Sequence, residues 1–288
     1  MDIESKKFLG QPKNFVSIFN ALLFDGQSVL KPEYLKDENS ELVMNVSSKH
    51  VDIIKRYEDG TYLDLFVIES QSYVDQCMVA RVMEYKSVAR MRYIRQNFKK
   101  HVPMHTRLPM ILTVVLYVGE SKWNAAKRLS ELEIIHPGFE DMFNEFKLNL
   151  IELNTNHKYN TGEKATQDFF DLLRMIYRKQ ILKEDLDREF NRDALYFAYV
   201  VTKNKELLNI YQESEKGDVK VCRALDEMFE ESTNKGIQMG IRQGIEQGIA
   251  LNQFEVYQTM LDKGFSVKAI ASIFSVSEES IKTLLMKA

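Results

Sequence analysis

The sequence predicts an α/β protein in which helices flank a mixed β-sheet and a helical extension follows at the C-terminus. Two observations predict this class. A β-rich hairpin near residue 60 is followed by a long helical stretch and an uninterrupted apolar run, and helical periodicity continues from about residue 164 onward. With 288 residues the chain exceeds the commonest size of a single domain, so we expect one main domain and smaller appendages.

The first expected elements are a helix and a hairpin. The stretch NFVSIFNALLF (14–24) has apolar residues at three-and-four spacing, which predicts an amphipathic helix that ends at Asp25-Gly26. The stretches VDIIKRY (51–57) and TYLDLFVIE (61–69) are rich in β-branched and aromatic residues and flank EDG. They predict a hairpin with a type I′ turn at Asp59-Gly60.

The next elements complete the expected sheet and its cover. Neither Gly nor Pro interrupts the chain from about Val74 to Phe98, which predicts one long helix. The apolar run LPMILTVVLYV (108–118) predicts a central strand covered on both faces, and alternation in FKLNLIEL (146–153) predicts a further strand. From about Lys164 to Glu231 the pattern is helical throughout. We therefore expect a core over 1–160, a helical extension packed on it over 161–232, a Gly-Ile repeat over 233–250 and a tail over 251–288.

The repeat KGIQMGIRQGIEQGIA places glycines on one helical face at positions 236, 240, 244 and 248. Each interior glycine costs about 1 kcal/mol relative to alanine, and close approach of a partner helix could offset that cost. Two interpretations fit this pattern: a homo-oligomer that assembles through its C-terminal helices, or a frayed linker.

The tail from residue 251 has the spacing of a helix-turn-helix unit, with a turn at residues 275–277. A helix that reads DNA bases would offer Arg, Lys, Asn or Gln, whereas SEESIKTLL offers Glu278, Glu279 and one lysine. This composition favours a packing or assembly module over a reader of DNA sequence.

Composition and charge narrow the class of protein. The net charge of −3 gives no global basic field, so nucleic-acid binding would need a local patch. Cys77 and Cys222 have no Cys or His at zinc-ligand spacing, which fits a reducing compartment. The N-terminus MDIESKKFLG has no apolar region of a signal peptide, and the longest apolar run is too short to cross a bilayer. We expect a cytoplasmic protein that does not enter a membrane.

The hairpin brings acidic residues together. With a turn at Asp59-Gly60, partners across the two strands sum to 119, so Asp52 lies opposite Val67 and His50 opposite Glu69. Because side chains alternate with period two, Asp52, Glu69 and Gln71 share one face. Two close carboxylates repel unless a proton or cation lies between them, and Mg²⁺ prefers one or two carboxylates together with water and phosphate oxygens. A solvated strand-end acid or an ion pair is the alternative interpretation.

This arrangement of D at 52, a short turn and E-x-Q at 69–71 resembles the PD-(D/E)XK nuclease fold, with Gln71 where the last Lys usually stands. The ordered set FNALLF, VDIIKRY, VIESQSYVDQCMVARVMEY, LPMILTVVLYVGESKW and FKLNLIEL resembles the Rpn family, recombination-promoting nucleases that are also labelled as transposases. The resemblance runs from about residue 10 to 180. Members often carry an acid on the first helix, where this chain has Asn14 or Ser17 instead.

The resemblance implies a DNA endonuclease that depends on Mg²⁺ or Mn²⁺. Asp52 and Glu69 would hold the metal, and Gln71 would orient the attacking water or a phosphate oxygen. Arg81 and Tyr85 match the R-x-x-x-Y of the family at the start of the long helix, with Arg81 contacting phosphate or Glu69 and Tyr85 as support.

The long helix also offers a basic surface. Residues 81–100 carry seven basic residues against the single acid Glu84. Arg92, Arg95 and Lys99 fall on one face by three-and-four spacing, which suits a phosphate track that binds DNA without reading its sequence. The expected DNA-binding residues are Arg81, Lys86, Arg90, Arg92, Arg95 and Lys99. A solvated helix face is the alternative for each of them.

Two functions from different classes therefore remain. The first is a metal-dependent DNA endonuclease, and the second is a protein with the nuclease fold but without its activity, which binds DNA or assembles oligomers.

Overall fold

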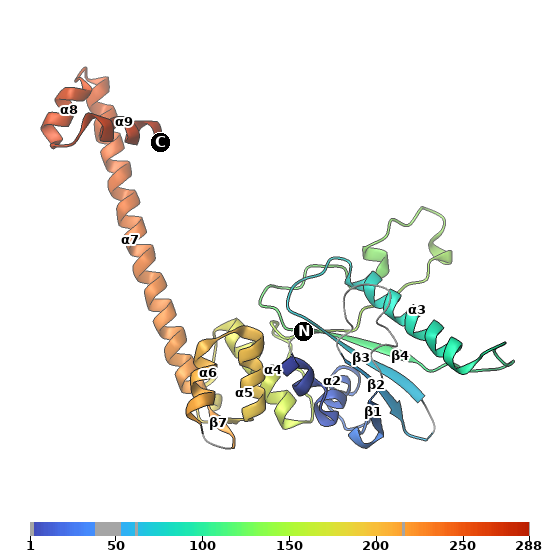
Figure 1. Ribbon diagram of the computed structural model, residues 1–288. Coiled ribbons are helices and arrows are strands. Elements are labelled where there is room, and N and C mark those ends of the chain that lie inside the picture. Colours follow the sequence, from blue (N-terminus) through green and yellow to red (C-terminus); the bar gives the residue numbers. More distant parts are fainter. Residues whose placement is uncertain (1–2, 38–52, 61–62, 215–216, 288) are drawn as a thin grey trace. The chain divides into compact units, whose positions relative to one another are not determined.

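The computed structural model in Figure 1 describes residues 3–37, 53–60, 63–214 and 217–287. The chain divides into two compact units, Met1–Asp226 and Glu227–Ala288. The first unit holds the sheet and most of the helices, and the second is wholly helical in its described part. The mixed α/β architecture with a helical C-terminus is the one that the sequence predicts.

Five strands of the described residues form one sheet, in the order β1-β2-β3-β4-β5. Its first three strands are antiparallel, whereas β4 runs parallel to β3 and β5 parallel to β4. The strands are β1 (Leu35–Asp37), β2 (Ile53–Glu58), β3 (Leu63–Gln71), β4 (Ile111–Tyr117) and β5 (Leu150–Glu152). The hairpin, the central strand and the last strand were predicted, but β5 is shorter than expected and β1 was missed.

The register of the hairpin differs from the predicted one by two residues. Ile54 pairs with Val67 and Ile53 with Ile68, so that partners sum to 121 and not to 119. Within the described residues the last pair is Glu58 with Leu63. An even shift keeps every side chain on its face, so the alternation of the sequence fits both registers equally well. Asp52 and His50 lie outside the described residues.

Two helices cover opposite faces of the sheet (Figure 1). Helix α2 (Pro12–Phe24) packs Phe19 on Phe66 of β3, with ring centroids 4.8 Å apart. Helix α3 (Met78–Asn97) packs Tyr85 and Ala89 against the opposite face, which includes Val67. The end of α2 at Asp25 is the predicted one, since Asp25 is left-handed with φ of 50°.

Helix α3 is shorter than predicted at both ends. Asp75 accepts a hydrogen bond from the N–H of Cys77 at 2.9 Å, just before the helix begins. At the other end Phe98 is extended, and the side chain of Asn97 donates to the carbonyl of Tyr93. Lys99 therefore lies beyond the helix, so the predicted common helical face of Arg92, Arg95 and Lys99 is wrong for Lys99.

The stretch predicted as helical throughout contains a small sheet. Strands β6 (Glu189–Phe190) and β7 (Val219–Lys220) pair antiparallel there. The remaining helices of the first unit are α1 (Ile3–Leu9), α4 (Lys164–Arg178), α5 (Arg192–Thr202) and α6 (Lys205–Glu213). Short 3₁₀ helices are η1 (Pro32–Tyr34), η3 (Leu129–Glu131), η4 (Glu140–Met142) and η5 (Lys183–Asp185).

The C-terminal elements follow the predicted pattern of helix, turn, short helix, turn and helix. They are α7 (Cys222–Asp262), α8 (Val267–Phe274) and α9 (Glu278–Lys287). Gly264 and Ser275 supply the left-handed turns. Tyr257, Ile270 and Ile281 form a small core of their own. Within the described residues, no helix has both the length and the apolar character needed to cross a membrane.

Candidate active site

Glu69 and Gln71 lie at the end of β3 and are both buried, with 2% and 5% of their surface exposed. Strand β3 lies between β2 and β4, and Glu69 pairs with Val115 and Gln71 with Tyr117. Both side chains are on the face that α3 covers, because they alternate in step with Val67. The side-chain amide of Gln71 donates to Oε1 of Glu69 at 2.7 Å. The two predicted residues therefore meet directly.

Arg81 reaches the same carboxylate from α3. Its Nη2 lies 3.1 Å from Oε1 of Glu69, and its Nη1 pairs with Asp75. The guanidinium also donates to the hydroxyl of Tyr85, at 2.7 Å from Nη2 and 3.1 Å from Nε. Positions 81 and 85 are neighbours on one face of a helix, which explains this last contact. The predicted contact of Arg81 with Glu69 and the support from Tyr85 are both present.

The charge of Arg81 is held in place by its neighbours. Burial of the guanidinium lowers its pKa, but hydrogen bonds with Asp75 and Tyr85 and the charge of Glu69 outweigh burial and raise the pKa of Arg81 further above its ordinary value. Burial, with the charge of Glu69, raises the pKa of the Tyr85 hydroxyl, so this group remains protonated at neutral pH. The end of β3 thus carries a permanent positive charge beside a buried carboxylate.

The other predicted DNA-binding residues differ in their exposure to solvent. Lys86 is half-buried, with its Nζ 5.1 Å from the ring centroid of Phe146. Burial, together with the nearby charge of Arg90, lowers the pKa of Lys86. Arg90, Arg95 and Lys99 are exposed and Arg92 is partly exposed. Arg81 belongs to the buried network, so the exposed basic surface consists of residues beyond the second turn of α3.

Asn14 and Ser17 lie on α2, where the resemblance led us to expect an acid, and both make structural contacts. Asn14 donates to the carbonyl of Phe8 at 3.0 Å. The hydroxyl of Ser17 donates to Thr166 of α4 at 2.8 Å. Both residues tie helices together within the core, so neither offers a third ligand at the end of β3.

Asp75 and Glu152 are two further acids that were not among the predicted residues, and only Asp75 contacts the network at the end of β3. Asp75 lies six residues before Arg81 in the sequence and pairs with it. This short separation from an arginine of the predicted helix is the signal that could have suggested the ion pair. Glu152 is buried on β5, in register with Tyr117. Its carboxylate accepts a hydrogen bond from the N–H of Trp123 at 2.8 Å, and Lys127 lies 3.4 Å away. Glu152 therefore anchors the loop after β4.

The donors at the end of β3 suit a hard cation. Carboxylate and amide oxygens are the ligands that Mg²⁺ prefers, and Glu69 and Gln71 supply both kinds. In the part of the chain that the structure describes, no group of three or more His, Cys, Asp or Glu side chains could hold a metal ion. Asp52, the other expected ligand, is outside that part.

Comparison with known proteins addresses the family. The sequence profile of the family described as putative transposase, YhgA-like, matches residues 6–207, which include the whole five-stranded sheet and α3. No curated protein and no solved structure matches the chain. Because the match covers well over half of the sequence, the chain belongs to the YhgA-like transposase family, as its resemblance to the Rpn family implied.

Proposed function

We propose that the chain is a metal-dependent DNA endonuclease that hydrolyses phosphodiester bonds. The observation that carries the proposal is the buried Glu69 at the end of β3, in contact with both Gln71 and Arg81. Burying a carboxylate costs free energy unless the group is paired. Buried ionisable groups with charged partners are often found at the functional sites of proteins. Membership of a family described as transposases supports DNA as the substrate.

Asp52 and Glu69 are the proposed metal ligands. Ile53 pairs with Ile68, and Asp52 and Glu69 are the residues next to that pair in the sequence. The two acids would hold Mg²⁺ or Mn²⁺ through their carboxylate oxygens. A bound divalent ion would polarise the phosphodiester and lower the pKa of a bound water.

Gln71 stands where the PD-(D/E)XK pattern usually has a lysine, and we propose that Gln71 and Arg81 together perform the roles of that lysine. Gln71 can orient water or a phosphate oxygen through its amide, but it has no charge. Arg81 has a permanent charge and already donates to Glu69, so it fixes the orientation of that carboxylate. Arg81 is therefore the cation that we propose for the negative charge that develops during hydrolysis.

The exposed cations of α3 are the proposed contacts for the DNA backbone. Arg90, Arg92 and Arg95 lie on the helix that also provides Arg81, and Lys99 follows that helix. Contacts of this kind position DNA without selecting a sequence, and salt weakens them steeply. Lys86 is the exception, since it rests on Phe146.

One observation favours a second candidate, a nuclease-fold protein that binds DNA or other copies without cutting. Gln71 and Arg81 both donate to Oε1 of Glu69, as the partners of a purely structural carboxylate would. In this candidate Glu69 has no role beyond the fold.

Nicking of supercoiled plasmid separates the two candidates. Wild-type protein should nick with Mg²⁺ or Mn²⁺ and stop when EDTA removes the metal. Asp52→Asn and Glu69→Gln keep the size of each side chain and should each lower the rate by more than about 100-fold, which exceeds the loss typical of an outer-shell partner. Affinity for DNA, measured by fluorescence anisotropy, should remain close to that of the wild type.

Glu152→Gln is the matched control, because it neutralises another buried acid two strands away. It should keep its nicking activity in any preparation that remains folded by circular dichroism. Equal inactivity of the wild type, Glu69→Gln and Glu152→Gln proteins, with DNA binding intact, would establish the second candidate instead.

A further inference from the structure

A cavity in the first unit gathers positive charge from separate parts of the chain. It measures about 200 Å³ and lies between the loop after β5, the last turns of α4 and the segment that follows α4. Asp185 is the single acid among the described residues that line it. The polar groups that accompany this acid are three cations and two amides, namely Lys158, Arg174, Arg178, Asn156 and Gln180.

Two of the three cations have no acidic partner. Within the described residues neither Lys158 nor Arg178 forms an ion pair, and both side chains are exposed. Arg174 pairs with Asp171 at 3.0 Å, and the carboxylate of Asp185 lies 3.5 Å from Arg188. The acid of the cavity is thus already paired with a cation, whereas two cations are left for a ligand.

Each of these two cations has an ordinary explanation when it is taken alone. Arg178 is the last residue of α4, where the dipole of a helix favours a positive charge. Lys158 lies in a loop, and exposed lysines are common there. Neither explanation accounts for cations from two separate elements that line one small cavity, because like charges repel at short range. A bound anion would remove that repulsion.

The size and the donors of the cavity favour a phosphate group as that anion. Pockets that enclose a whole drug-sized ligand usually measure about 300–1,000 Å³, and this cavity is smaller. Arginine binds phosphate oxygens with parallel N–H groups, and lysine binds them as a point charge. The side-chain amides of Asn156 and Gln180 can donate further hydrogen bonds to such oxygens.

The cavity lies at the edge of the sheet where β3 ends. Strands β3, β4 and β5 are parallel, so their carboxyl ends share one edge, and Lys158 follows β5. The hydroxyl of Tyr177, next to Arg178 in the sequence, donates to the carbonyl of Val118 just after β4. The N–H of Val118 donates in turn to the carbonyl of Gln71 at 2.8 Å. Two hydrogen bonds therefore connect the end of β3 with the turn of α4 that carries Arg178.

We propose that this cavity binds a phosphate of the DNA backbone beside the proposed cleavage site. The identity of the ligand rests on the proposed function, because a chain that cuts DNA at the end of β3 brings backbone phosphates to that edge of the sheet. Helix α4 is bonded to α2, which packs on the face opposite α3. The cavity would therefore hold DNA on the side of the sheet that the cations of α3 do not reach.

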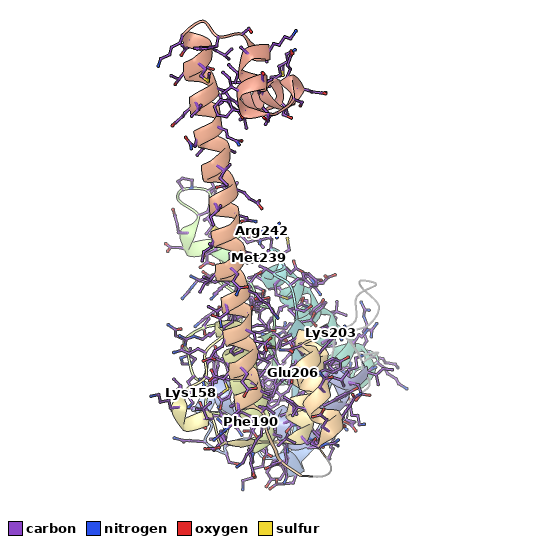
Figure 2. All side chains as sticks on the ribbon, turned by 90° about the vertical axis from the view of Figure 1, so that its left-hand side faces the viewer. Lys158, Phe190, Lys203, Glu206, Met239 and Arg242 are labelled. Atoms are coloured by element: carbon purple, nitrogen blue, oxygen red, sulfur yellow. The ribbon has the colours of Figure 1, made fainter. Side chains whose placement is uncertain are left out.

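The experiment measures the affinity of the full chain for a duplex oligonucleotide by fluorescence anisotropy at a series of salt concentrations. EDTA is present throughout, so that metal-dependent cutting does not affect the readout. Lys158→Gln with Arg178→Gln removes two charges from the cavity, and the control Lys203→Gln with Lys205→Gln removes two charges elsewhere. Lys158 and Lys203 lie well apart on the first unit (Figure 2). All four side chains are exposed, so both variants should fold, which circular dichroism checks.

We expect the cavity variant to bind DNA at least about tenfold more weakly than the wild type at low salt, because it loses charged hydrogen bonds to a phosphate. The slope of log affinity against log salt should decrease by about 0.9, the value for one phosphate. The control variant should retain the wild-type affinity within about twofold, since salt screens exposed charges far from the ligand. Lys158→Arg with Arg178→Lys keeps both charges and should retain the slope of the wild type.

Equal affinities and slopes of the cavity and control variants would overturn the proposal, as would a wild type that does not bind DNA. Calorimetric titration with inorganic phosphate distinguishes a free anion from the DNA backbone. Binding of inorganic phosphate by the wild type, with DNA affinity unchanged in the cavity variant, would assign the cavity to a free anion and so contradict the proposal. Failure of the proposed function has a different signature: plasmid stays intact, while the cavity variant still binds DNA more weakly than the wild type.

Discussion

The end of β3 buries charged side chains, whereas the exposed part of α7 leaves large apolar side chains in water. At β3 an ion pair is buried, with 18% of the Arg81 side chain and 2% of the Glu69 side chain exposed. On α7 the ion pair between Arg242 and Glu246 is exposed, at 81% and 63%, and isoleucines stand in solvent beside it. The first region satisfies its charges within the chain, whereas the second leaves its apolar face uncovered. The comparison shows that the chain pairs its buried charges at the end of β3, whereas on α7 it leaves large apolar side chains exposed to water.

Removing Arg81 should produce the largest change in stability. Arg81→Met keeps much of the side-chain volume but leaves the carboxylates of Glu69 and Asp75 without their shared cation. Loss of one partner of a buried ion pair costs about 3–5 kcal/mol, and we expect a decrease in the free energy of unfolding of this size. Urea denaturation followed by circular dichroism measures it. Arg95→Met, an exposed position on the same helix, should change stability by less than about 0.5 kcal/mol.

The buried start of α7 should give a pH effect of intermediate size. Burial, with the charge of Asp185, raises the pKa of the Cys222 thiol from 9.0 to about 12. The unfolded chain therefore loses this proton near pH 9 while the folded chain keeps it, so stability is full below pH 9 and falls as pH rises toward 12. The slope is at most about 1.4 kcal/mol per pH unit.

Urea titrations between pH 8 and pH 10 test this effect. Cys222→Ala should have a flatter dependence than the wild type, whatever its stability at pH 8. The exposed thiol of Cys77 serves as the control, because Cys77→Ala should retain the slope of the wild type. Parallel curves for wild type and Cys222→Ala would show that the thiol of Cys222 makes no such contribution.

The exposed ion pair of α7 should give the smallest effect. Glu246→Gln removes the charge that Arg242 contacts at 3.0 Å, but both side chains are largely in water. Exposed pairs at this helical spacing contribute about 0.3–0.5 kcal/mol, and salt screens them. Urea denaturation at low and at high salt should therefore barely separate Glu246→Gln from the wild type. A loss comparable with that of Arg81→Met would break the contrast between the two regions.

Local patterns in the sequence determined a large part of the fold. The spacing of apolar residues predicted α2, the hairpin, β4 and the helices of the tail, because each depends on the period of one element. Period two also predicted that Glu69 and Gln71 share a face, and the four-residue spacing of Arg81 and Tyr85 predicted their contact. The roles of Asp52, Glu69 and Gln71 in catalysis and of the basic residues in DNA binding remain predictions.

Only the tertiary structure decided which distant residues meet. The observed register of the hairpin differs by two residues from the predicted one. Both registers place every side chain on the same face, so the alternation of the sequence does not distinguish them. In the observed register Phe66 packs between Tyr57 and Phe19, a contact that only the tertiary structure reveals. The side chain of Lys86 lies over Phe146, a residue sixty positions away that no helical period can specify. Strands β6 and β7 have two residues each, too few for any alternation to reveal them. The periodicity of each helix and strand can be read from neighbouring residues in the sequence. The register of the strands and the contacts between distant elements depend on close packing of the whole core, so only the tertiary structure decides them.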